Sequence, residues 1–188
     1  MLSAPSNLLT TEEYRSLPEG PPHYQLIEGR LFMSPSPNRY HQVICRNLLV
    51  LLSKYLEEQP VGEIFQAPSD VYLTPFDVYQ PDLFFVSKAN ASILTEQGAA
   101  GAPDLVIEIL STATARFDRE IKRKVYAQTG VKELWLLDPD LRQALVFQLN
   151  TASETAPATY GLGASFSSVH FPGLTLAVER IFLPSRLG

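Results

Sequence analysis

The sequence has only one cysteine and three histidines among its 188 residues. The lone Cys45 cannot form an internal disulfide, and no spacing of cysteine and histidine resembles a zinc site. Any metal site must therefore be built from oxygen ligands. Cys45 also lacks the neighbours of a catalytic triad, so we expect it to be a small buried side chain.

Long apolar runs are also missing. No stretch approaches the roughly 20 residues that a membrane span requires, and residues 1–5 have neither the basic start nor the apolar segment of a signal peptide. We therefore expect a cytoplasmic protein without a membrane partner. The composition, 45% hydrophobic and 19% charged, suits a single globular domain over residues 1–188. The net charge of −5 counts against a broad nucleic-acid surface, although it is compatible with a local basic strip.

One apolar stretch contains an anomaly. Residues 103–110 (Pro-Asp-Leu-Val-Ile-Glu-Ile-Leu) have the short continuous apolar pattern of a buried strand, and glycines precede it. Glu108 lies inside this strand. A buried carboxylate costs several kcal/mol unless it is paired, hydrogen-bonded or bound to a metal. The fold must therefore supply a partner for Glu108.

The rest of the chain alternates between strand and helix patterns. The order strand, helix, strand from residue 104 to residue 137 predicts a right-handed crossover with parallel strands. Strands at 62–66, 70–74 and 82–86 suggest an antiparallel meander. The other expected elements are a lead-in helix within 9–17, a hairpin at 23–33, an amphipathic helix at 40–59, a short helix at 87–97, a helix at 116–129 capped by Gly130, strands at 133–137 and 143–149, C-terminal strands near 165–170 and 174–178, and a turn at 179–182.

Asp82 is a candidate second carboxylate. It alternates in register with Phe84 and Val86, and Pro81 restricts the start of this strand to an edge or entry position. Asp82 therefore lies at the mouth of a strand, where it is either a solvated turn aspartate or part of a site.

Glu28 and His41 each have two interpretations. Glu28 shares a strand face with Tyr24 and Leu26, which points it inward, but it also adjoins Gly29, where a turn would direct it into solvent. His41 lies in the first turn of the amphipathic helix, where it points into a site, packs or caps. The pattern favours packing or capping.

Two lysines supply the possible cation. Lys122 and Lys124 flank the apolar stripe of the helix at 116–129 on opposite sides, and periodicity alone does not decide whether either points inward. Two carboxylates on neighbouring strands, such as Asp82 and Glu108, can hold a Mg²⁺ or Mn²⁺ ion that keeps several waters. With a lysine nearby, this arrangement is typical of phosphodiester hydrolysis.

The chain also resembles a known family. The similar segments keep a characteristic order and spacing, although no single one is specific. They are residues 24–31 (Tyr-Gln-Leu-Ile-Glu-Gly-Arg-Leu), the helix beginning near His41, 80–83 (Gln-Pro-Asp-Leu), 102–111 (Ala-Pro-Asp-Leu-Val-Ile-Glu-Ile-Leu-Ser), Asp118 with Lys122 and Tyr126, 130–139 (Gly-Val-Lys-Glu-Leu-Trp-Leu-Leu-Asp-Pro) and 171–174 (Phe-Pro-Gly-Leu). They resemble the Uma-two family, bacterial proteins assigned as endonucleases of the Pro-Asp, Asp/Glu-x-Lys superfamily.

The resemblance implies an α/β fold. We expect a restriction-endonuclease-like mixed β-sheet flanked by helices, with an N-terminal helix-hairpin and additional C-terminal strands. It also implies a hydrolase that cleaves DNA with Mg²⁺ or Mn²⁺. A homodimer would bring two sites to one duplex despite the acidic charge, a hypothesis that sedimentation at micromolar concentration tests. The alternative is a catalytically inactive nucleic-acid-binding or protein-assembly domain of the same fold.

Particular residues follow from the resemblance. Asp82 and Glu108 match the two metal-binding acids. Lys122 matches the catalytic lysine, because it stands four residues after Asp118 and four before Tyr126.

Other residues complete the implied site, and three features of the sequence depart from the family pattern. Glu28 matches an additional catalytic acid, and His41 and Lys124 are possible accessory residues. One of the departures is Ile121, which stands where a glutamate is expected just before the helix lysine, with Glu120 one place earlier. The lysine normally found two residues after the second acid is Leu110 here, so the cation must come from the helix. Asp104 also follows a proline, but it lies on the same strand as Glu108 and is too close to be the first acid.

Overall fold

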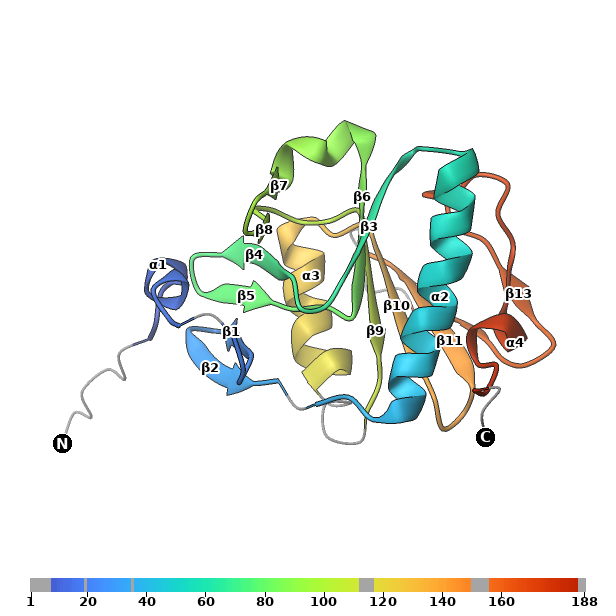
Figure 1. Cartoon of the computed structure of the whole chain (residues 1–188), viewed down its shortest axis with the longest axis horizontal. Coiled ribbons are helices and arrows are strands. Elements are labelled where there is room, and N and C mark those ends of the chain that lie inside the picture. The colour runs from blue at the N-terminus through green and yellow to red at the C-terminus, as the bar shows by residue number, and fades with distance from the viewer. Residues whose placement is uncertain (1–7, 19, 35, 112–116, 150–155, 186–188) are drawn as a thin grey trace.

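The computed structural model describes residues 8–18, 20–34, 36–111, 117–149 and 156–185. Its centre is a six-stranded mixed sheet in the order β12-β11-β10-β9-β6-β3, with helices α2 and α3 packed on opposite faces (Figure 1). The strands are β3 (Gly62–Gln66), β6 (Leu83–Ser87), β9 (Leu105–Ile109), β10 (Glu133–Asp138), β11 (Gln143–Gln148) and β12 (Ala158–Tyr160).

A second sheet packs against the α3 side of the central sheet, in the order β2-β1-β5-β4-β8-β7. Its strands are β1 (Tyr24–Ile27), β2 (Arg30–Met33), β4 (Asp70–Thr74), β5 (Asp77–Tyr79), β7 (Leu94–Thr95) and β8 (Gly98–Ala99). The other elements are α1 (Thr11–Arg15), the 3₁₀-helix η1 (Lys88–Ile93), the strand pair β13 (Ser165–Phe166) and β14 (Leu176–Ala177), and α4 (Val178–Ile181).

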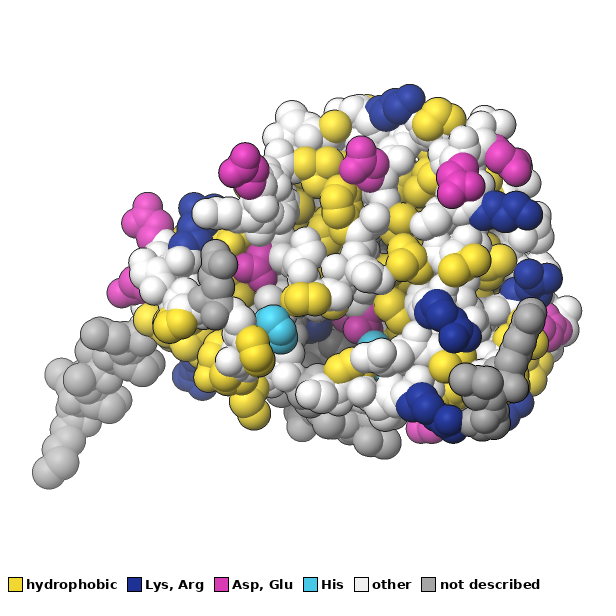
Figure 2. Space-filling model, viewed as in Figure 1, with side chains coloured by type: hydrophobic (Ala, Val, Ile, Leu, Met, Phe, Trp, Pro, Cys, Tyr) yellow, Lys and Arg dark blue, Asp and Glu magenta, His cyan; other side chains and the backbone are white. Residues whose placement is uncertain are grey.

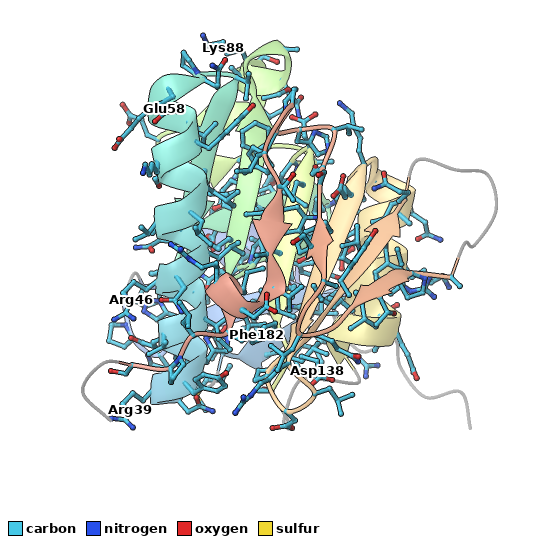
Figure 3. All side chains as sticks on the ribbon, turned by 90° about the vertical axis from the view of Figure 1, so that its right-hand side faces the viewer. Arg39, Arg46, Glu58, Lys88, Asp138 and Phe182 are labelled. Atoms are coloured by element: carbon cyan, nitrogen blue, oxygen red, sulfur yellow. The ribbon has the colours of Figure 1, made fainter. Side chains whose placement is uncertain are left out.

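Helix α2 (Arg39–Glu58) confirms the predicted amphipathic helix. Asn38 caps it, because its side chain accepts a hydrogen bond from the backbone amide of His41. Ile44, Leu48 and Leu52 recur every four residues and are fully buried, so one stripe of the helix packs on the sheet. Figure 3 shows α2 running along the sheet with the C-terminal segment beside it.

The predicted parallel crossover is also confirmed. Strands β9 and β10 pair in parallel, and a π-helix, η2 (Phe117–Lys122), continues into α3 (Arg123–Thr129) between them. Gly130 ends α3 with φ of 103°, a left-handed conformation that favours glycine. Arg116, where the helix was expected to begin, lies outside the described residues.

The predicted meander is wrong. β3 pairs antiparallel with β6 in the central sheet, whereas β4 turns back on β5 in the second sheet. The Thr74 hydroxyl donates to Asp77 at 2.6 Å across this tight turn, which helps to fix the hairpin. Local strand patterns do not encode which partner a strand takes, because pairing depends on the packing of the complete sheet.

Smaller elements differ in extent from the prediction. The hairpin β1–β2 forms as expected, with Tyr24 opposite Met33. The expected helix at 87–97 is only the 3₁₀-helix η1 followed by β7, and the C-terminal strands are shorter than predicted. No helix within the described ranges is long and apolar enough to cross a membrane.

Alternation places the residues of the central strands on two cores. Leu105, Ile107 and Ile109 of β9 face α2, whereas Val106 faces α3 and the second sheet. Glu108 follows Val106 by two residues, so it points toward the α3 side. This alternation determines where the anomalous carboxylate emerges.

Asp104, at the start of β9, is a buried structural residue. Its side chain is 1% exposed and accepts hydrogen bonds from the Ser87 backbone amide at 2.8 Å and from the Lys132 ammonium. Burial raises the pKa of Asp104, but these hydrogen bonds outweigh it and leave the pKa below its ordinary value. Asp104 thus joins the beginnings of β9 and β10 to the end of β6.

We expect Asp104→Asn to lower the free energy of unfolding by about 1–3 kcal/mol at neutral pH, because the backbone amide of Ser87 loses its charged acceptor. Lys132 is half exposed, so its ion pair contributes little of this. Since the pKa is depressed, the stabilisation exists above the ordinary aspartate pKa of about 3.9 and disappears as the pH falls through the folded-state pKa. Urea unfolding across this pH range should show that the native protein and Asp104→Asn have increasingly similar free energies of unfolding as the pH falls. Asp140→Asn, at an exposed turn position, is the control, and an equal loss there would contradict this assignment.

Candidate active site

Glu108 has two hydrogen-bond donors from the helix that follows its strand. Its Oε1 accepts from Lys122 Nζ at 2.9 Å and from the Tyr126 hydroxyl at 2.8 Å. The Glu108 and Lys122 side chains are only 5% and 7% exposed. The ion pair with Lys122 and the hydrogen bond from Tyr126 together offset the desolvation cost of burying the Glu108 carboxylate. The partner demanded by the sequence is therefore found on η2 and α3.

The two candidate lysines have different environments. Lys122 is buried and contacts Glu108, whereas Lys124 is exposed. Lys122 Nζ also lies 5.8 Å from the centroid of the Tyr79 ring, on β5 of the second sheet. The helix therefore directs Lys122 inward between the two sheets.

Asp82 immediately precedes β6, the strand next to the one that carries Glu108. Leu83 pairs with Ile107 in the antiparallel register of β6 and β9, so the next residues along the two strands are Asp82 and Glu108. Both side chains line the same cavity, Glu108 from the α3 face of β9 and Asp82 from the bend that leads into β6. Asp82 Oδ2 also accepts a hydrogen bond from the Ile109 amide at 2.7 Å. The tertiary structure thus selects the site position for Asp82 over the solvated turn.

His41 reaches Asp82 from the first turn of α2. Its Nε2 lies 3.1 Å from Asp82 Oδ2, and the two side chains are 13% and 20% exposed. Burial opposes charge on the imidazole, but the hydrogen bond with Asp82 and the negative charges of Asp82 and Glu108 raise the pKa of His41. The sequence pattern favoured packing or capping, and this expectation is wrong for the side chain because the helix start aims it at the neighbouring strand.

Glu28 does not point inward as alternation suggested. It follows β1 in the turn before β2, has a positive φ of 49° and is exposed. Its backbone amide donates to Asp77 Oδ1 at 2.9 Å. The strand ends one residue earlier than the alternation requires, so the Gly29 turn directs the carboxylate to solvent. Glu28 does not line the cavity described below.

A cavity of about 450 Å³ lies over these residues. Figure 2 shows a hollow on this face in which acidic, basic and histidine side chains are visible. The cavity brings together Asp82, Glu108, Lys122 and His41, which come from the bend before β6, from β9, from η2 and from α2. Other lining residues are His23, Gln25, Ser34, Ser36, Pro37, Asn38, Gln42, Ala67, Pro68, Gln80, Ile109 and Ser111.

The donor chemistry fits a divalent cation that retains water. Asp82 and Glu108 supply carboxylate oxygens beside a cavity with room for water and substrate, which is how Mg²⁺ is commonly bound. Within the described ranges, no group of three or more histidine, cysteine, aspartate or glutamate side chains could hold a metal by itself. Water and substrate oxygens would therefore have to complete the coordination sphere.

Tyr126 is a site residue whose contact with Glu108 sequence reasoning did not identify. The available signal was its spacing, because residues four apart lie on the same face of a helix and Tyr126 follows Lys122 by four. Its ring also packs edge-on against Tyr79, with centroids 5.5 Å apart. The tyrosine thus holds the Glu108 carboxylate from a rigid, buried position.

Comparisons with known proteins agree with this architecture. The crystal structure of "a putative nuclease belonging to DUF820 from Anabaena variabilis ATCC 29413" is similar at a TM-score of 0.79 and 20% identity, with 93% of this chain and 97% of that chain covered. This likeness confirms the expected mixed α/β fold. No curated protein matches the chain. The sequence matches the Uma2 family, described as "Putative restriction endonuclease", over residues 11–179. Because this match spans most of its length, the chain belongs to the Uma2 family.

Proposed function

We propose that this protein is a divalent-metal-dependent endonuclease that hydrolyses phosphodiester bonds of DNA. One observation carries the proposal: Asp82, at the mouth of β6, and Glu108, on the adjacent strand β9, line one cavity with the buried Lys122. The family description supports nuclease chemistry in general. The homodimer and the cytoplasmic location expected from the sequence belong to the same proposal.

Asp82 and Glu108 would hold the metal. A bound Mg²⁺ or Mn²⁺ lowers the pKa of its water and neutralises charge on the scissile phosphate. The protein orients both carboxylates in advance, because the Ile109 amide fixes Asp82 and the Tyr126 hydroxyl fixes Glu108. Such preorganisation removes the cost of arranging the donors during the reaction.

Lys122 would supply positive charge at the reacting phosphate. Its ammonium is already beside Glu108 and at the cavity wall, so it needs no large movement to approach a bound phosphate oxygen. In a site sheltered from water, such a charge stabilises the negative charge of the transition state more strongly than it would in bulk water. His41 acts through Asp82, whose Oδ2 it contacts, and is a positioning residue in this scheme.

The direct test is the nicking of supercoiled plasmid in the presence of Mn²⁺. We expect the native protein to nick and Lys122→Ala to be slower by roughly 100-fold or more, because a preorganised charge is removed from the transition state. Lys124→Ala is the matched control, since it removes an exposed lysine two positions away, and it should retain nearly full activity.

Equal nicking by the native protein and Lys122→Ala would indicate a contaminating nuclease. The absence of nicking from a well-folded native protein, on plasmid and on single-stranded DNA with either metal, would favour the inactive nucleic-acid-binding or protein-assembly domain. In that case, the carboxylates and Lys122 would serve as a structural hydrogen-bond cluster.

A further inference from the structure

The outer side of α2 carries positive charge that no acidic residue on the same side offsets. Arg39, Arg46 and Lys54 are exposed and follow one another at intervals of about two helical turns, so they form one stripe, the basic stripe of α2. No aspartate or glutamate occurs in the helix before Glu57, in its last turn. Figure 3 shows Arg39 and Arg46 on the side of α2 that faces away from the sheet, with Glu58 at the opposite end of the helix. In a chain whose net charge is −5, this stripe is a local positive surface.

Ion pairs within the described residues do not neutralise Arg46 or Lys54. Arg46 Nη2 donates a hydrogen bond to Asn47 Oδ1 at 3.2 Å, and this partner is uncharged. Asn47 Nδ2 in turn donates to the backbone carbonyls of Ile181 and Leu183 at 3.1 and 2.9 Å, which ties the helix to the C-terminal segment. The guanidinium is therefore positioned on a rigid element and keeps its charge for a partner in solution.

The basic stripe begins at the candidate active site. Asn38, His41 and Gln42, at the start of α2, line the cavity that contains Asp82 and Glu108. From this end, the three cations of the stripe extend over roughly 22 Å of helix axis, because an α-helix rises about 1.5 Å per residue. Figure 2 shows Lys and Arg side chains over α2 on the same face of the molecule as the hollow. A substrate that leaves the cavity along α2 therefore passes these cations.

We infer that the basic stripe of α2 binds the sugar-phosphate backbone of a DNA duplex, on one side of the bond that is cleaved. Each strand of a duplex has one phosphate about every 3.4 Å along the axis, so a duplex lying along the stripe places about six phosphates of each strand within its length. Backbone contacts of this kind fix the position of the duplex without reading its sequence. This inference deepens the proposed function and rests on it, because the adjoining cavity is where the duplex would be cut.

The stripe suits a duplex better than a single strand, because it offers charge without a stacking surface. Proteins that bind single strands combine cations with aromatic rings on which unpaired bases stack. The two tyrosines of α2 are partly buried and pack against the core. Their hydroxyls donate to backbone carbonyls of the C-terminal segment, Tyr40 to Phe182 at 3.1 Å and Tyr55 to Pro172 at 2.9 Å. Both rings are thus held by the protein, and only the cations remain for the substrate.

The experiment measures the binding of a fluorescein-labelled DNA duplex of about 20 base pairs by anisotropy, over a series of salt concentrations. The protein is the full chain carrying Asp82→Asn, for which we expect no cleavage. Adding Arg46→Gln or Lys54→Gln should raise the dissociation constant roughly 3- to 10-fold at low salt, the effect of one lost phosphate contact. Each should also lower the slope of log K against log salt concentration by about 0.9, and the double variant should lower it by about twice as much. Arg46→Lys keeps the charge and should bind within about twofold, which separates the charge from the hydrogen bond to Asn47.

Lys124→Gln is the matched control for Lys54→Gln, because it removes an exposed lysine on α3, which packs on the opposite face of the central sheet. It should leave duplex binding within about twofold. An equal loss with Lys124→Gln would overturn the inference, as would a double variant that binds like its parent.

Two results with the parent protein would also overturn the inference. One is the absence of measurable duplex binding at low salt, and the other is tighter binding of a single strand of the same sequence. Both substituted side chains are exposed, so the variants should keep the Tm of the parent, which calorimetry checks. If the plasmid assay is negative while the α2 variants selectively weaken duplex binding, the α2 surface stands and the proposed catalysis fails.

Discussion

Asp82→Asn is expected to abolish two properties together, Mn²⁺-dependent nicking and the thermal stabilisation of the protein by Mn²⁺. Asparagine keeps the shape of the side chain, and its carbonyl oxygen can still accept the hydrogen bond from the Ile109 amide. What disappears is the negative charge beside Glu108. A hard cation held mainly by two carboxylates loses much of its affinity when one of them is neutral.

The expected sizes follow from linkage. A metal at 100 times its dissociation constant stabilises the native state by about 2.7 kcal/mol, which corresponds to a rise in Tm of roughly 5–10 °C for a chain of this length. We expect this rise for the native protein and almost none for Asp82→Asn. Nicking should fall by at least about 100-fold, because the preorganised charge at the reacting phosphate is lost.

Asp140→Asn serves as the control, since it makes the same chemical change at an exposed turn and should retain both properties. A scanning calorimetry series with and without Mn²⁺ measures the shift directly. If Asp82→Asn kept the full shift in Tm, Asp82 would not be a metal ligand. The pairing of this residue with His41 would then be structural.

Glu108→Gln is expected to have the largest effect on stability in the absence of metal, a loss of about 3–5 kcal/mol in the free energy of unfolding. The reason is the environment of Lys122, whose side chain is only 7% exposed and lies 2.9 Å from Glu108 Oε1. Glutamine preserves the volume but removes the negative charge. The buried ammonium then pays a desolvation cost that the carboxylate had offset.

A double variant separates this cause from a packing defect. Glu108→Gln combined with Lys122→Met removes both charges, and it should recover most of the lost stability, because replacing a buried ion pair by neutral groups is often nearly neutral. Urea unfolding of the two single variants and the double variant measures the coupling. A double variant as unstable as the sum of its single variants would show that the ion pair is not the source. Tyr126→Phe should cost less, since it removes one hydrogen bond to Glu108 and leaves the ion pair.

Part of this site was predictable because its constraints are local. Glu108 stands out in an apolar strand, and the strand-helix-strand order places a helix lysine above the sheet. Pro81 before the strand correctly indicated that Asp82 lies at the mouth of β6, one residue before Leu83. Periodicity was unable to choose between Lys122 and Lys124, because both border the same apolar stripe.

Other features depended on residues far apart in the chain. The contact between His41 and Asp82 spans 41 positions, and it arises because α2 begins beside the mouth of β6. The separation of β4 from β3 into another sheet likewise reflects a choice of partner that no local pattern records. For Glu28 the deciding feature was a local boundary. β1 ends at Ile27, one residue earlier than alternation required, so Glu28 lies in the turn and is exposed.

The sequence by itself therefore determined the long elements, the parallel crossover and the need of Glu108 for a partner. These follow from hydrophobic periodicity and from the cost of burying a charge, both of which act over a few residues. Only the tertiary structure decided that Lys122 and Tyr126 meet that need and that His41 joins Asp82. These depend on which surfaces pack together, and that is a property of the whole chain.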